Sequence, residues 1–251
     1  MPELIILGSS NAVPSEGHET THMVLVGEAR LILIDCGSNP LVRLKNVGLQ
    51  ALDVTDLILT HFHPDHISGV PLFLLDSWLL GRQAPLKIFG LEPTLERLRQ
   101  MMALYEWHAW PGFFPIEFQP VLEDEMAIVL ESNDIKILAS PVDHMIPNIG
   151  LRIEARKSGR VLAYSCDTSH SEAVIRLGRG ADVLIHEAAG RMFGHSSAAQ
   201  AGEVARQAGV QKLYLIHYHT WDFDPRPLVE EARQAFPGSV ELAVDFQRIG
   251  I

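Results

Sequence analysis

The hexapeptide His61-Phe62-His63-Pro64-Asp65-His66 is the most informative part of this sequence. It follows residues 54–60, whose apolar centre is typical of a buried strand. The polar cluster therefore begins where a predicted strand ends. A loop that merely contains three histidines is the simpler interpretation, but partner residues elsewhere in the chain favour a metal site.

The spacing within the hexapeptide suits two metal ions. In extended backbone, residues two apart point to the same side, so His61 and His63 can bind one ion together. Pro64 fixes its own φ and begins a turn, which lets Asp65 and His66 face a second ion nearby. Imidazole nitrogens and carboxylate oxygens suit zinc, with manganese and iron as alternatives.

Three further polar residues follow strand-like runs later in the chain. They are His144 in Pro141-Val142-Asp143-His144, Asp167 in Ser165-Cys166-Asp167-Thr168, and His217 in Leu215-Ile216-His217. Alone, His144 or His217 would be interpreted as a structural histidine, whereas beside the hexapeptide each is favoured as a ligand. Asp167 is the natural bridge, because each of its carboxylate oxygens can face one ion.

The composition narrows the class of protein. The 251 residues are 47% hydrophobic and 20% charged, which predicts a sizeable core and excludes a disordered chain. A net charge of −11 argues against a general nucleic-acid or anionic membrane surface. No apolar run approaches the ~18 residues of a membrane span, the start lacks the basic region of a signal peptide, and two cysteines make no disulfide framework. We expect a cytoplasmic protein without membrane contact.

The order of predicted elements indicates two sheets packed together with helices outside, in one domain over residues 1–251. Strands are predicted over 3–7, 23–26, 31–34, 54–60, 86–89, 116–121, 127–130, 134–139, 149–155, 160–165, 182–185, 213–216 and, as the last, 240–244. Helices are predicted over 67–80, 93–104, 171–177, 196–208 and 226–236.

With these motifs in place, the chain resembles the metallo-β-lactamase superfamily, whose signature H-x-H-x-D-H the hexapeptide fits. Within it, the chain is most similar to ribonuclease Z and its phosphodiesterase relatives. The stretches that support this are Leu7-Gly8-Ser9-Ser10-Asn11-Ala12-Val13-Pro14, Ile34-Asp35-Cys36-Gly37, Ile185-His186-Glu187-Ala188 and Gly194-His195-Ser196-Ser197-Ala198-Ala199-Gln200-Ala201. The resemblance implies an α/β (α+β) fold, a four-layer αββα sandwich with a binuclear centre at the sheet edges.

The resemblance also implies roles for individual residues. One ion would be bound by His61, His63, His144 and Asp167, and the other by Asp65, His66, Asp167 and His217. The implied catalytic residues are Asp65, His195, which assists the leaving group or the transition-state charge, and Glu187, which supports His195. The alternatives are an exposed histidine before a helix and an ordinary salt-bridge partner. Asp35 is expected to orient a ligand histidine.

The expected function is a binuclear metal-dependent hydrolase that uses a metal-bound hydroxide on a small phosphodiester. A ribonuclease Z-like endonuclease that matures tRNA 3′ ends is one alternative, and an ester or lactone hydrolase is another. A non-catalytic protein stabilised by its metals remains a further alternative, although His195 would be superfluous in a closed structural site.

The chain departs from the ribonuclease Z pattern in three places. Only a hairpin fits between His144 and Asp167, where ribonuclease Z has an extended arm that grips tRNA, so tRNA is the less favoured partner. His219 stands where the relatives have a serine-containing turn, and it could line the pocket. Cys166 replaces a glycine before the bridging aspartate.

The aromatic segment 107–114 has no clear period. It could line the pocket, form the contact of a homodimer, or pack on the core.

Overall fold

A computed structural model describes all 251 residues, and its first sheet has seven strands in the order β14-β1-β2-β3-β4-β5-β6. The strands are β1 (Glu3–Gly8), β2 (His22–Val26), β3 (Leu31–Ile34), β4 (Asp56–Ile58), β5 (Leu86–Leu91), β6 (Ile116–Val121) and β14 (Arg248–Gly250). The pairs from β14 to β3 are antiparallel, and the pairs from β3 to β6 are parallel.

The second sheet repeats this pattern, with the order β13-β12-β11-β10-β9-β8-β7. Its strands are β7 (Ala127–Glu131), β8 (Ile135–Pro141), β9 (Ile149–Ala155), β10 (Val161–Tyr164), β11 (Val183–Glu187), β12 (Lys212–Ile216) and β13 (Ser239–Leu242). The pairs from β7 to β10 are antiparallel, and those from β10 to β13 are parallel.

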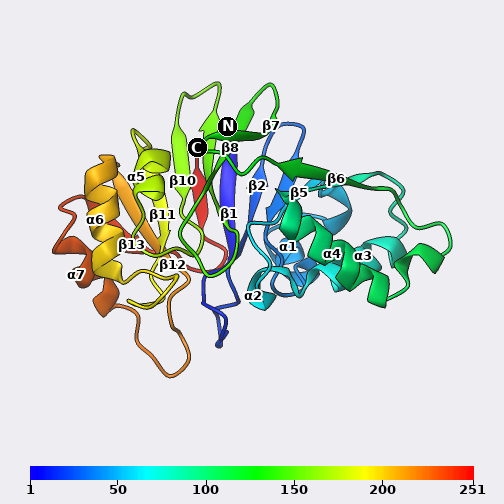
Figure 1. The fold of residues 1–251 in the computed structure, drawn as a ribbon, viewed down its shortest axis with the longest axis horizontal. Coiled ribbons are helices and arrows are strands. Elements are labelled where there is room, and N and C mark those ends of the chain that lie inside the picture. The colour runs from blue at the N-terminus through cyan, green and yellow to red at the C-terminus, as the bar shows by residue number, and fades with distance from the viewer.

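Helices cover the outer face of each sheet (Figure 1). The first sheet carries α1 (Leu41–Asn46), α2 (Pro64–Ile67), α3 (Val70–Leu79) and α4 (Glu92–Leu104), and the second carries α5 (Glu172–Gly178), α6 (Ala198–Ala208) and α7 (Pro227–Arg233). Short 3₁₀ turns lie at Ala51–Asp53 and Trp107–Ala109. The predicted αββα sandwich is confirmed.

The apolar core has three layers because both faces of each sheet are covered. In β1, Leu4 and Ile6 pack between the sheets, while Ile5 and Leu7 pack against the helices of the first sheet. A third cluster fills the space between the second sheet and its helices. Strands that are covered on both sides, such as β1 and β3, are apolar at nearly every position rather than at alternate ones, which explains their continuous apolar runs in the sequence.

Several predicted boundaries were wrong. The helix predicted over 67–80 begins only at Val70, with α2 as a separate turn, because Pro71 belongs in a first helical turn and would break a helix interior. Of the strand predicted over 54–60, only the three residues of β4 form a strand. Helix α1 and strand β14 were not predicted, so 240–244 is not the last strand. Both are short, six and three residues, and carry no readable period.

The segments that follow β4, β8, β10 and β12 meet at one edge of the sandwich, the lower edge in Figure 1. Both chain termini lie at the upper edge of the same view. None of the helices has the length and apolar character that crossing a membrane requires.

Candidate metal centre

The hexapeptide leaves β4 in an extended conformation and then turns into α2. His63 is extended, with φ −86° and ψ 150°, and precedes Pro64 at the start of the helix. Asp65 and His66 therefore lie in the first turn of α2, where the backbone has changed direction. This is the change of direction that the sequence predicts at Pro64.

The first group of donor atoms comprises His61, His63, His144 and Asp167. Nδ1 of His63 lies 3.0 Å from Nε2 of His61 and 2.9 Å from Nε2 of His144. Oδ2 of Asp167 lies 3.9 Å from Nε2 of His61. All four donor atoms lie within 4.8 Å of one another.

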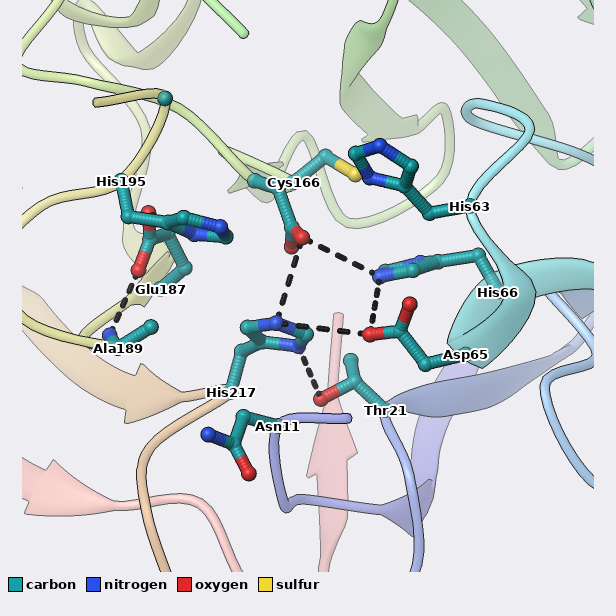
Figure 2. A network of polar contacts seen from close by, with 12 residues as sticks. Asn11, Thr21, His63, Asp65, His66, Cys166, Glu187, Ala189, His195 and His217 are labelled. Carbon is teal, nitrogen blue, oxygen red and sulfur yellow. Dashed lines mark hydrogen bonds and ion pairs between the residues drawn. The ribbon is translucent and has the colours of Figure 1, made fainter. Parts of the chain in front are cut away.

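The second group comprises Asp65, His66, Asp167 and His217. Figure 2 shows Asp65, His66 and His217 of this group side by side. Oδ2 of Asp167 lies 3.4 Å from Nε2 of His66 and 3.3 Å from Nε2 of His217. Oδ2 of Asp65 lies 3.5 Å and 3.8 Å from the same two nitrogens. Asp167 thus belongs to both groups, as predicted, but Oδ2 is the oxygen nearest the histidines of each group, rather than one oxygen for each ion.

Both groups fit a divalent metal ion. Four ligands about 2.1 Å from a tetrahedral ion lie about 3.4 Å apart, which is within the range of the spacings above. Nε2 of His66 and Oδ1 of Asp167 are buried without a hydrogen-bond partner in the protein, which is costly unless another group binds them. A third possible donor group, His61, His66 and Cys166, overlaps the other two.

Hydrogen bonds at the far side of the histidine rings fix which nitrogen faces the centre. Nδ1 of His66 donates to Oδ2 of Asp35 (2.9 Å), and Nδ1 of His144 donates to the Gly194 carbonyl (2.7 Å). Nδ1 of His217 lies 3.2 Å from Oγ1 of Thr21. Such outer contacts orient metal-binding imidazoles and raise their basicity. Asp35 stands as predicted, beside a candidate ligand and outside both groups.

The charge states of Asp167 and His217 suit ligands. Burial alone would raise the pKa of Asp167, but the imidazoles of His217 and His66 outweigh it and hold the pKa well below its usual range. Burial lowers the pKa of His217 to about 4. At neutral pH the carboxylate is therefore charged and this imidazole keeps a free lone pair. Burial would lower the pKa of His66, but the carboxylates of Asp167 and Asp35 outweigh it and raise this pKa, so His66 would have to release a proton on binding an ion.

A non-glycine residue with left-handed backbone lies within two residues of the end of each of the strands β3, β10 and β12. Asp35 follows β3 with φ 60°, Cys166 follows β10 with φ 53°, and His217 follows β12 with φ 56°. Such residues cost of order 1–3 kcal/mol each and tend to cluster at functional sites. The glycine that the resemblance implies at the position of Cys166 would adopt this conformation without strain.

His195 and Glu187 form a separate pair beside the donor groups. Nδ1 of His195 lies 3.1 Å from Oε1 of Glu187, which also accepts the Ser196 N–H at 2.8 Å. Burial raises the pKa of Glu187 to about 7. Burial would lower the pKa of His195, but the hydrogen bond and charge of Glu187 outweigh it and raise the pKa. The contact at Nδ1 thus orients the His195 ring and leaves its Nε2 without a hydrogen bond to Glu187.

A cavity of about 280 Å³ adjoins these residues. Its lining contains His63, Asp65, Asp167, His195 and His217 of the predicted site, together with Asn11, Ala12, Pro64, Met145, Ala189, Met192 and His219. The sequence did not identify Asn11, Met145 or Met192 as lining residues, although Asn11 lies in the stretch 7–14 that supports the superfamily resemblance. His219 lines the cavity, as the sequence suggested.

The aromatic segment 107–114 does not reach this cavity. Trp107 and Phe114 are buried against the core beside α3 and α4, and Trp78 of α3 stacks on Trp110. The segment borders a different hollow of about 450 Å³. Of its three interpretations, the pocket wall is wrong for this cavity, and packing on the core is observed.

We expect Asp35→Asn to weaken binding of the ion at the second group by 10–100-fold, roughly the effect of losing an outer carboxylate. The amide cannot match the charge that Asp35 offers to Nδ1 of His66. Metal titration of the apoprotein, followed by calorimetry, measures this affinity. Equal affinities for wild type and variant would show that Asp35 only supports the backbone through Thr60.

Comparison with known proteins fits this geometry. Residues 30–218 match the Beta-lactamase superfamily domain. The chain belongs to this superfamily. The stretch matched contains both donor groups, so the resemblance predicted from the hexapeptide is confirmed.

Individual members of the superfamily cover nearly the whole chain. Ribonuclease Z of Methanothermobacter thermautotrophicus is 29% identical over 94% of this chain and 93% of its own length. The metallo-β-lactamase fold protein YhfI from Bacillus subtilis has a TM-score of 0.84 at 21% identity, over 99% of this chain and 98% of its own. A diphosphatase of the PhnP family has a TM-score of 0.76 at 20% identity, over 100% and 98% of the two chains.

Proposed function

We propose that this chain is a binuclear metal-dependent hydrolase that acts on a small phosphodiester. The observation that carries the proposal is Asp167, which belongs to two donor groups beside one cavity. The coarser prediction of a hydrolase is supported by the relatives named above, among them ribonuclease Z and a diphosphatase. The two ions are proposed to be zinc, with manganese or iron as alternatives.

The residues around the cavity would have different roles in hydrolysis. Two divalent ions bound in the donor groups would lower the pKa of a bound water toward neutrality. The carboxylate of Asp65 lines the cavity and can accept a hydrogen bond from the attacking water. The contact with Glu187 raises the pKa of His195, which favours the protonated ring, and that ring can donate a proton from Nε2 to the leaving oxygen.

The short connection between His144 and Asp167 supports a small substrate. It contains only the antiparallel pair β9 and β10. The turn 156–160 lies at the far end of β9 from His144, about 20 Å away along a seven-residue strand. No arm therefore extends over the cavity from this segment.

The basic side chains of this connection are already engaged within the protein. Arg152 pairs with Glu154 at 2.8 Å, Arg156 with Glu131 at 3.2 Å, and Lys157 with Glu28. Arg160 donates to the carbonyl of Gly250. Because RNA is held mainly through phosphate contacts from free Lys and Arg, these residues offer little grip for a folded tRNA.

Processing of tRNA 3′ ends is the second candidate, and the named relative favours it. The alignment with that ribonuclease Z spans 292 positions, more than the 251 residues of this chain, so the relative has segments that this chain lacks. A second copy of this chain could supply missing basic surface in a homodimer. Ester or lactone hydrolysis remains the third candidate, since the same chemistry attacks carbonyl carbon.

We expect the metal-loaded protein to hydrolyse bis(p-nitrophenyl) phosphate with higher catalytic efficiency than it cleaves a pre-tRNA at physiological salt. A chelator should abolish turnover, and added metal should restore it. Accurate cleavage at the tRNA 3′ end with much higher efficiency, falling steeply as salt rises, would instead establish the ribonuclease function. Metal-independent or absent turnover on every ester would favour the non-catalytic alternative.

A further inference from the structure

A second histidine faces the cavity without belonging to either donor group. His219 is exposed at the rim, and its Nδ1 lies 2.8 Å from the side-chain nitrogen Nδ2 of Asn11. Asn11 is buried, and its backbone N–H donates to the carbonyl of Tyr218 at 3.1 Å. The rim residue is thus attached to the loop that follows β1, and Figure 2 shows Asn11 below His217.

The orientation of the Asn11 amide is fixed by its own loop. Oδ1 of Asn11 accepts the backbone N–H of Val13 at 3.1 Å, so the oxygen must face Val13 and the NH₂ must face His219. An amide NH₂ can only donate a hydrogen bond. Nδ1 of His219 must therefore accept, and the ring proton of the neutral imidazole lies on Nε2.

This arrangement is the reverse of that at His195. There, a carboxylate accepts a hydrogen bond from Nδ1–H, and the ring gains a donor at Nε2 only when it is charged. At His219 the neutral ring already offers an N–H at Nε2, and no protein side chain or backbone group hydrogen-bonds that nitrogen. The cavity therefore contains His195, whose Nδ1 contacts a carboxylate, and separately His219, whose contact with Asn11 leaves Nε2 as the donor.

We propose that His219 binds an anionic phosphoryl oxygen of the substrate through its Nε2–H, and that Asn11 is the positioning residue that selects this tautomer. The inference rests on the proposed phosphodiester function, which it deepens by naming a binding residue. His219 lies on the rim rather than among the donor groups, so it would contribute binding energy equally before and during the reaction.

Uniform binding raises KM when it is lost and leaves kcat nearly unchanged. A hydrogen bond to a charged group contributes about 1.5–3 kcal/mol, so His219→Ala should raise KM for bis(p-nitrophenyl) phosphate about 10-fold or more. His219→Gln, which keeps an N–H donor, should recover most of the loss. His108→Ala, which removes an exposed histidine far from the cavity, is the matched control.

A carboxyl ester as substrate distinguishes a failure of the role of His219 from a failure of the phosphodiester function. p-Nitrophenyl acetate has no anionic oxygen, so His219→Ala should leave its KM unchanged. An unchanged KM for the diester in His219→Ala, with active wild type, would overturn the role of His219 alone. A wild type that hydrolyses only the acetate would overturn the phosphodiester function.

The tautomer itself is observable without turnover. Nitrogen-15 NMR of the zinc-loaded protein at alkaline pH should show the His219 proton on Nε2, and Asn11→Asp should move it to Nδ1, because a carboxylate only accepts. Inorganic phosphate should shift the Nε2–H resonance in the wild type. A proton on Nδ1 in the wild type, or no response to phosphate, would contradict the inference even if no diester is turned over.

Discussion

Asp167→Ala is expected to release both metal ions and to lower turnover by well over 100-fold. Its Oδ2 is the donor atom that the two groups share, so one substitution damages both sites. Loss of a mere outer contact already costs 10–100-fold, and loss of a bridging ligand must exceed it. Elemental analysis of the purified variant, with turnover of a diester, measures both effects.

Two control variants remove a carboxylate of one donor group only, or a carboxylate outside both groups. Asp65→Ala should lower occupancy of the second group only, because Asp65 belongs to no other. Asp124→Ala, at an exposed carboxylate outside the cavity, should change neither. A fully loaded wild type with at most one ion per chain would contradict the binuclear proposal.

His195→Ala is expected to retain both ions and lose about 10²-fold or more in turnover. The ring lines the cavity but supplies no atom to either donor group, so its removal should affect chemistry and not metal content. The loss should be greatest for a substrate whose leaving group is a poor one, since that oxygen needs the proton most.

A leaving-group series makes the test specific. For a good leaving group such as p-nitrophenolate, the deficit of His195→Ala should shrink. Glu187→Gln should give a smaller loss of the same kind, because the amide still contacts His195 but without a charge. Wild-type turnover of His195→Ala on a poor leaving group would reduce His195 to a structural residue.

The sequence predicted the candidate centre better than it predicted the helices. His61, His63, Asp65 and His66 are close along the chain, so local geometry alone indicates a metal site. His144, Asp167 and His217 were favoured as ligands because each follows a strand-like run, and the superfamily resemblance then divided the seven residues between two ions. The structure brings all seven residues together.

The features that sequence reading missed depend on contacts between distant segments. Strand β14 is defined by its pairing with β1, at the opposite end of the chain, and three residues show no pattern of their own. Asn11 acquires significance only through its contact with His219 across the cavity rim. The break before α3 could have been predicted from Pro71, because its ring is incompatible with a continuous helix from residue 67. The helical spacing of the apolar residues on both sides of it favoured one long helix instead.

The two donor groups draw their residues from both sheets, and this has a consequence for how the protein folds. His61 and His63 follow β4 of the first sheet, whereas His144 and Asp167 follow strands of the second. A four-ligand site therefore exists only after the sheets have docked, and metal affinity becomes folding free energy for that docking step. Ribosomal synthesis delivers the first-sheet ligands early and His217 near the end, so the second donor group would be the last to be completed.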